Sequence, residues 1–188
     1  DEHTSLGELA AIVSEALENA GITATLSGGA AVSIYSNNKY ESEDLDFVTA
    51  AMVDELKTVL KPLGFAHTGR PRLSVFDHPK TKWYLEFPPA PLSFGGTYVD
   101  PSDCARIDTG IGYFRIITTT HSVMDRLIAA AAWNEPQSLE QALLVTAHCM
   151  DRIEWRALDE WVESEGIQSS KEIVEYYEKI ARKRPTNR

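Results

Sequence analysis

The stretch SGGAAVSIYSNNKYESEDLDFVTA, residues 27–50, decides the fold. The Gly28-Gly29 pair leads into an apolar run that indicates a helix, and Asp44 and Asp46 then stand in a strand-like run. Successive side chains of a strand point to opposite faces, so the two aspartates share one face while their apolar neighbours enter the core. Like charges on one face repel each other unless a cation lies between them, and Mg²⁺ prefers oxygen ligands. The stretch therefore predicts a metal site; the alternative is an edge strand with solvated acids.

The glycine pair predicts the other half of the same site. Glycines before a helix let a ligand approach the backbone, and a helix N-terminus offers free N–H groups and a dipole that attract phosphate. Any tight strand-to-helix turn also uses Gly-Gly, so the evidence lies in the combination with Asp-x-Asp. The pattern has neither the spacing of a dinucleotide fingerprint nor the Lys-Ser/Thr of a P-loop. We therefore expect Ser27, Gly28 and Gly29 to bind phosphate.

Composition indicates a soluble globular protein. The chain has 188 residues, 43% of them hydrophobic, which is enough for one core with a helical appendage. Two cysteines are too few for a disulfide framework, and no signal peptide or membrane-length apolar run is visible, so we expect a cytoplasmic protein and no membrane partner. A net charge of −10 argues against wrapping duplex nucleic acid. Basic side chains gather in one region: Lys57, Lys61, Arg70, Arg72, Lys80 and Lys82.

Hydrophobic periodicity predicts an α+β fold. Strands are expected at 22–26, 44–48, 72–76, 83–87, 104–110 and 113–118, and the Pro/Gly-rich stretch 88–96 is expected to be a loop. Helices are expected at 6–17, 30–36, 51–62, 122–134, 136–149, 155–165 and 170–183. We therefore predict a mixed sheet flanked by helices over residues 1–120, and a helical subdomain packed on it over residues 121–188.

The segment around the aspartates resembles a known family. Gly28-Gly29 followed by Ser42-x-Asp44-Leu45-Asp46 is similar to the signature of the nucleotidyltransferase superfamily, which has the polymerase-β-like fold. The nearest likeness is to minimal AbiEii-type enzymes, many of which are toxins of toxin–antitoxin systems. Those proteins often carry Arg two residues before the Ser or Thr, whereas Tyr40 stands there in this chain.

The resemblance implies a third carboxylate on a neighbouring strand. Glu86 lies in the apolar run KWYLEFP, where an unpaired carboxylate would be costly to bury. The alternative is an ordinary ion-pair partner for Lys82 or Arg72. Asp77 is a weaker candidate because Asp-His-Pro indicates a turn.

The likeness extends to the helix pair at residues 121–145, whose pattern DRL-AA…W-x-x-x-Q-x-L-x-Q-A recurs in AbiEii-like proteins. Arg126 and Trp133 share one helix face. The resemblance implies that Arg126 holds a triphosphate and that Trp133 stacks on a base, with Gln137 nearby. The alternatives are an ion pair for Arg126 and a core position for Trp133.

The resemblance implies a metal-dependent nucleotidyltransferase. Two Mg²⁺ ions would be held by Asp44, Asp46 and Glu86, the catalytic set. The NTP would be bound by Ser27, Gly28, Gly29, Ser42 and Arg126. The acceptor hydroxyl would belong to tRNA or a protein, and an antitoxin would be a further partner. Two alternatives stay open: a small-molecule nucleotidyltransferase of the aminoglycoside type, and a non-catalytic nucleotide-binding module.

Overall fold

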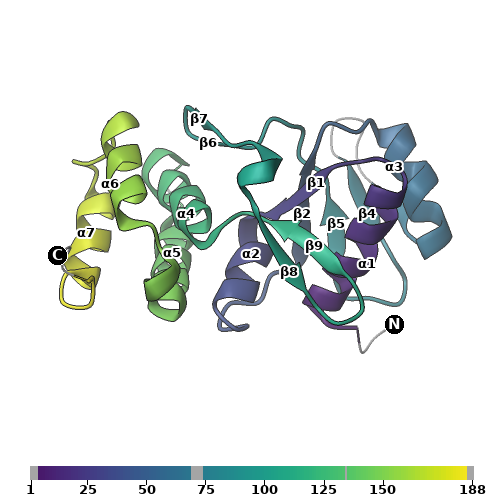
Figure 1. Cartoon of the computed structure of the whole chain (residues 1–188), viewed down its shortest axis with the longest axis horizontal. Helices are drawn as coiled ribbons and strands as arrows, with labels where there is room; N and C mark the ends of the chain where they lie inside the picture. Colours follow the sequence, from purple (N-terminus) through teal and green to yellow (C-terminus); the bar gives the residue numbers. More distant parts are fainter. Residues whose placement is uncertain (1–3, 69–73, 134, 186–188) are drawn as a thin grey trace.

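The protein is built on a mixed β-sheet, seen here in a computed structural model that describes residues 4–68, 74–133 and 135–185, without the side chains of Trp133 and Pro136. Seven strands follow the order β3-β4-β5-β2-β1-β9-β8 (Figure 1). Their bounds are β1 Ala24–Ser27, β2 Asp44–Thr49, β3 Ala66–His67, β4 Val75–Asp77, β5 Tyr84–Glu86, β8 Ala105–Asp108 and β9 Tyr113–Ile116. The central strand β2 runs antiparallel to β1 and parallel to β5.

Helices pack on the sheet and extend beyond one end of it. They are α1 Leu6–Asn19, α2 Gly28–Tyr35, α3 Val53–Leu60, α4 Thr119–Trp133, α5 Pro136–Cys149, α6 Trp155–Ser164 and α7 Lys171–Ile180. The helices α1, α2 and α3 contact the sheet and α1 contacts the other two, whereas α4–α7 form a group at the far end (Figure 1). The expected α+β class with a mixed, helix-flanked sheet is confirmed. None of the helices within the described ranges has the length and apolar character needed to cross a bilayer.

Three very short strands were not predicted. The stretch 88–96, expected to be a loop, contains β6 (Ser93–Phe94), which forms a separate hairpin with β7 (Thr97–Tyr98). The third is β3, at one edge of the main sheet. A two-residue strand is too short to leave an alternating pattern, which explains the error. The expected strand at 72–76 begins outside the described residues, and β4 starts at Val75.

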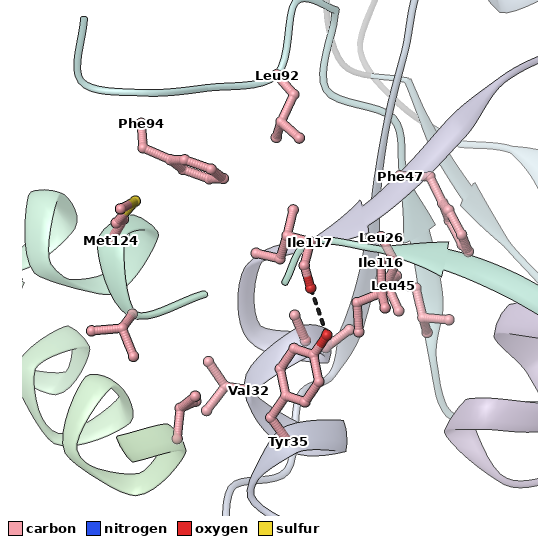
Figure 2. Packing of buried hydrophobic residues seen from close by; sticks show 14 of the residues in the cluster. Leu26, Val32, Tyr35, Leu45, Phe47, Leu92, Phe94, Ile116, Ile117 and Met124 are labelled. Carbon is pink, nitrogen blue, oxygen red and sulfur yellow. Dashed lines mark hydrogen bonds between the residues drawn. The ribbon is translucent and has the colours of Figure 1, made fainter. Parts of the chain in front are cut away.

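The core confirms that β2 is an interior strand. Leu45 and Phe47 are fully buried, on the face opposite the aspartates. In the same cluster, the Tyr35 hydroxyl donates to the Ile117 carbonyl at 2.6 Å (Figure 2). The same hydrophobic cluster continues into α4 through Met124. The division into two domains near residue 120 stays a prediction.

Candidate active site

Three carboxylates from two adjacent strands meet on one face of the sheet. Asp46 of β2 lies in register with Glu86 of β5, and Asp44 lies two residues before Asp46. Oxygen atoms of all three lie within 4.8 Å of one another, and each residue is partly exposed. None of the three forms an ion pair with a described residue. A cluster of hard, unneutralised oxygen donors fits Mg²⁺, so Asp44, Asp46 and Glu86 are the residues that could hold a metal.

The helix α2 begins beside these carboxylates. The register of β1 with β2 pairs Ser27 with Asp46, so α2 starts at Gly28 immediately next to the acidic face. Ser27 makes no side-chain capping bond to the helix, and its hydroxyl donates instead to the Asp46 carbonyl at 3.4 Å. The first N–H groups of α2 therefore remain available to an anion at this edge.

Position 28 requires a glycine, both because of its backbone conformation and because Asp46 lies close to it. Its φ is +60°, a left-handed value that side chains disfavour, and a Cβ there would collide with Oδ2 of Asp46. At Gly29 a Cβ would lie 2.6 Å from the Ser42 hydroxyl and 3.3 Å from the Tyr40 ring. Of the two glycines, Gly28 is the one with a positive φ.

Ser42 holds one of the carboxylates. Its hydroxyl donates to Oδ1 of Asp44 at 2.8 Å, and its own N–H donates to the Ser33 hydroxyl at 2.9 Å. Its carbonyl accepts from the Trp83 indole at 3.1 Å. Ser42 is buried in this network, so its geometry is that of a residue that orients Asp44.

Arg126 reaches the site from α4. Its guanidinium donates to Oδ2 of Asp125 at 2.7 and 3.2 Å and to Oε1 of Gln141, on α5, at 3.1 Å. Burial opposes the charged form of Arg126, but Asp125 outweighs it, so the pKa of Arg126 is raised. The guanidinium is thus fixed at the boundary of the helical group and the sheet, with Asp46 close enough to contribute to the same shift.

Burial and crowding raise the pKa values of Asp46 and Glu86. Burial, followed by repulsion from Asp44 and Glu86, raises the pKa of Asp46 to about 7, against a smaller effect of Arg126. Burial and Asp44 also raise the pKa of Glu86. Tyr84 lies opposite Asp44 on the same face, and burial together with these carboxylates raises its pKa to about 12. The carboxylates of the site therefore repel one another, and a bound cation would relieve this repulsion.

Two cavities meet at Asp46 and Arg126. The first, about 450 Å³, lies toward α5 and is called here the α5 chamber; besides Asp46 and Arg126 it is lined by Gly29, Tyr40, Asp44, Glu135, Gln137, Ser138 and Gln141. The second, about 330 Å³, is lined by Ser27, Gly28 and Asp125 and by residues of the 88–94 segment. Two adjoining cavities that share lining residues would allow two ligands to be held with their reacting groups close together.

The structure brings together all eight predicted site residues: Ser27, Gly28, Gly29, Ser42, Asp44, Asp46, Glu86 and Arg126. The Trp133 side chain, Arg70 and Arg72 lie outside what the structure describes. Asp77 accepts from the Thr68 hydroxyl at 2.8 Å and is not part of the acidic cluster. Lys82 pairs with Glu41 at 3.8 Å, whereas Arg72, the other ion-pair partner considered for Glu86, is not among the described residues.

Sequence reasoning did not predict roles for Tyr84, Asp125, Glu135, Ser138 and Gln141, which the structure places at the site. The sequence could have indicated Tyr84, because this residue stands two positions before Glu86 in the strand and so shares its face. Asp125 and Gln141 lay inside the quoted helix pattern, yet the bonds that link them through Arg126 join two helices. That pairing depends on how α4 packs on α5, which the pattern does not reveal.

No protein-family model matches the chain, and no curated protein matches it in sequence. Solved structures do match. A nucleotidyltransferase-like antigenic protein from Paracoccidioides brasiliensis has a TM-score of 0.56 and 15% identity, covering 78% of this chain and 77% of that chain. The protein ANT(2″)-Ia in complex with adenylyl-2″-tobramycin has a TM-score of 0.51 and 15% identity, covering 72% and 84%. The solution structure of the antibiotic-resistance factor ANT(2″)-Ia gives 0.51 and 14%, covering 82% and 92%. The chain therefore has a nucleotidyltransferase-like fold.

Proposed function

We propose that the protein is a metal-dependent nucleotidyltransferase, which moves a nucleoside monophosphate from an NTP to an acceptor hydroxyl. One observation carries the proposal: three carboxylates that form no ion pair with any described residue lie within 4.8 Å of one another beside the open N-terminus of α2. The fold it shares with ANT(2″)-Ia adds support, because that protein was solved with an adenylylated product. The AbiEii-type likeness and a toxin role remain parts of the prediction.

Different residues of the chain would bind the metal, bind the phosphates and orient the metal ligands. Asp44, Asp46 and Glu86 would hold Mg²⁺, which when bound neutralises phosphate charge and favours the ionised acceptor hydroxyl. The N–H groups of α2 and the Arg126 guanidinium would bind the phosphates. Ser42 keeps Asp44 in position through its hydroxyl.

Glu86 is the candidate to receive the acceptor proton. Its carboxylate has two oxygens, so one could bind the metal while the other accepts the proton. The acceptor oxygen would attack the α-phosphorus while the bond to the pyrophosphate oxygen breaks. Both the α5 chamber and the cavity of about 330 Å³ adjoin Asp46, so the two substrates could approach it from different sides.

The test is a transfer assay with α-³²P-labelled NTPs, Mg²⁺ and candidate acceptors. We expect label transfer by the parent and none by Asp46→Asn, because the amide removes a charge that the metal needs. A calorimetric titration of Mg²⁺–NTP distinguishes the non-catalytic alternative. Binding without transfer to any acceptor would favour a nucleotide-binding module, and no binding at all would refute the proposal.

A further inference from the structure

Tyr84 stands on the face of the sheet that carries the three carboxylates. It is the first residue of β5, pairs in register with Asp44 and precedes Glu86 by two positions. Side chains two positions apart in a strand share one face, and neighbouring strands lie about 4.8 Å apart. The chain itself therefore places a phenol beside the residues that would hold the metal.

The Tyr84 hydroxyl has no hydrogen-bond partner among the residues that the structure describes. The hydroxyls of four other tyrosines each form a hydrogen bond within the protein: Tyr35, Tyr113, Tyr176 and Tyr177. A buried tyrosine hydroxyl usually needs such a partner, but Tyr84 is only partly buried. Its hydroxyl is therefore free to meet a ligand.

Serine hydroxyls at the site are already engaged. Ser42 donates to Oδ1 of Asp44 at 2.8 Å, and Ser27 donates to a backbone carbonyl of β2 at 3.4 Å. Ser138, which lines the α5 chamber, donates to a carboxylate of its own helical turn at 3.0 Å. Unlike these three, the Tyr84 hydroxyl can turn toward a bound nucleotide without losing a hydrogen bond to a described residue.

The backbone of Tyr84 is fixed relative to the acidic cluster. Its N–H donates to the Glu43 carbonyl at 3.3 Å, and the indole of the preceding Trp83 donates to the Ser42 carbonyl at 3.1 Å. Ser42 in turn holds Asp44 through its hydroxyl. One short segment of β2 thus positions both the phenol and a metal ligand, and a nucleophile held in this way reacts as if it were very concentrated.

The ring also has room to move. Tyr84 lines a cavity of about 500 Å³, which Ser42, Glu43, Lys82 and Trp83 also line. Open space beside a partly exposed ring permits more than one side-chain rotamer. The backbone fixes where the phenol begins, and the cavity lets its hydroxyl adjust to a bound nucleotide.

We propose that Tyr84 is itself an acceptor, so that the protein nucleotidylates its own chain at this hydroxyl. The inference rests on the proposed function and adds a modification site to it. The phenolic oxygen forms a bond to the α-phosphorus of the NTP, the bond from that phosphorus to pyrophosphate breaks, and the phenolic proton passes to Glu86 or solvent. The products are an O-nucleotidyl-tyrosine at position 84 and pyrophosphate.

The test is mass spectrometry of the purified protein after incubation with Mg²⁺ and ATP, GTP, CTP or UTP, with no other acceptor added. We expect an intact mass that is larger by a nucleoside monophosphate with at least one of the NTPs, and peptide mapping that places the addition on Tyr84. No addition with any NTP, or an addition on another residue, would overturn the inference.

A matched pair of variants tests the hydroxyl. Tyr84→Phe keeps the ring and removes the acceptor oxygen, so the addition should disappear while Mg²⁺–NTP binding in calorimetry remains. Tyr98→Phe is the control: Tyr98 lies on β7 with its side chain 73% exposed, and the addition should be unchanged. A Tyr84→Phe protein that is modified as fast as the parent would contradict the assignment.

The reaction should also take place within one molecule, because Tyr84 and the carboxylates belong to the same sheet. The rate constant of modification should then be independent of protein concentration. An affinity-tagged Asp46→Asn chain keeps Tyr84, and it should stay unmodified when it is mixed with the active parent. Modification of the tagged chain would contradict transfer within one molecule.

The failure of this inference is distinguishable from failure of the proposed function. If Mg²⁺–NTP does not bind the parent, the proposed function fails. If the parent transfers label to an added acceptor while Tyr84 stays unmodified, only the inference about Tyr84 fails.

Discussion

Asp46 is a crowded carboxyl group, whose pKa is raised to about 7 by burial and by the neighbouring acids. It lies beside Asp44 and Glu86, it is largely buried, and Gly28 is a glycine partly because Asp46 occupies the space of a side chain there. Neutralisation by a proton or by a metal would relieve the same repulsion. The residue therefore links stability, pH and metal binding, and two predictions follow from it at this scale.

The stability of the metal-free protein should fall as pH rises through the range that Asp46 titrates. Its folded pKa is about 7, above the ordinary value of 3.8, so the folded state binds the proton more tightly than the unfolded state does. Stability is then greatest below about pH 4 for this group and declines up to about pH 7, by roughly 2–4 kcal/mol. Urea unfolding in EDTA across this range should show the decline in the parent and a weaker one in Asp46→Asn. Identical pH profiles would show that Asp46 is not crowded.

Gly28→Ala should impair ligand binding at the site, in addition to the loss of stability caused by an alanine with a left-handed backbone. An alanine with a left-handed φ costs about 1–2 kcal/mol, and at Gly28 its Cβ also collides with Oδ2 of Asp46. Gly21→Ala is the control, because Gly21 has φ +75° and open space around a Cβ. We expect both variants to lose stability in urea unfolding, but only Gly28→Ala to lose Mg²⁺–NTP binding in calorimetry. Binding retained by Gly28→Ala would show that the close approach has no role in the site.

At the scale of elements, β2 makes the site by lying between β1 and β5. Antiparallel pairing with β1 puts the start of α2 beside Asp46, and parallel pairing with β5 puts Glu86 there. Alternation along the sequence was enough to predict the shared face of Asp44 and Asp46. The prediction of Glu86 needed the family resemblance, which implies a third carboxylate, together with its place in an apolar run.

What could not be predicted depends on contacts between distant segments. The β6–β7 hairpin is held by Glu165, about seventy residues later in the chain, and its two-residue strands leave no periodic pattern. Arg126 was foreseen, but its bond to Gln141 requires the packing of α4 on α5. Even within the Gly-Gly pair, only the structure shows that Gly28 has the left-handed backbone.

The contact between α4 and α5 yields a third prediction. Arg126→Ala should weaken NTP binding about tenfold or more and nucleoside binding much less, because a charged hydrogen-bond donor to phosphate is lost. Arg156→Ala, which breaks an exposed ion pair with Glu160 on α6, is the control and should change neither affinity. Equal losses for NTP and nucleoside with Arg126→Ala would mean that the guanidinium only holds α5 through Gln141.

At the scale of the whole molecule, the protein has a net charge of −10 and gathers carboxylates where the two cavities meet. An anionic nucleotide would be repelled from such a surface unless a metal comes with it. In the proposed function, the sheet would hold the metal ligands and the N-terminus of α2 would bind phosphate, while α4 and α5 line the α5 chamber. The account thus depends on Mg²⁺–NTP binding through Asp46.

The most direct test is the change in melting temperature that Mg²⁺–NTP causes in the parent and in Asp46→Asn. At a ligand concentration of about 100 Kd the parent should gain roughly 2.7 kcal/mol, which for a chain of this size raises Tm by about 5–11 °C. Asp46→Asn should melt higher than the parent without ligand, because repulsion is relieved, and should gain little or nothing from Mg²⁺–NTP. A variant that melts like the parent without ligand and gains as much from Mg²⁺–NTP would contradict the account.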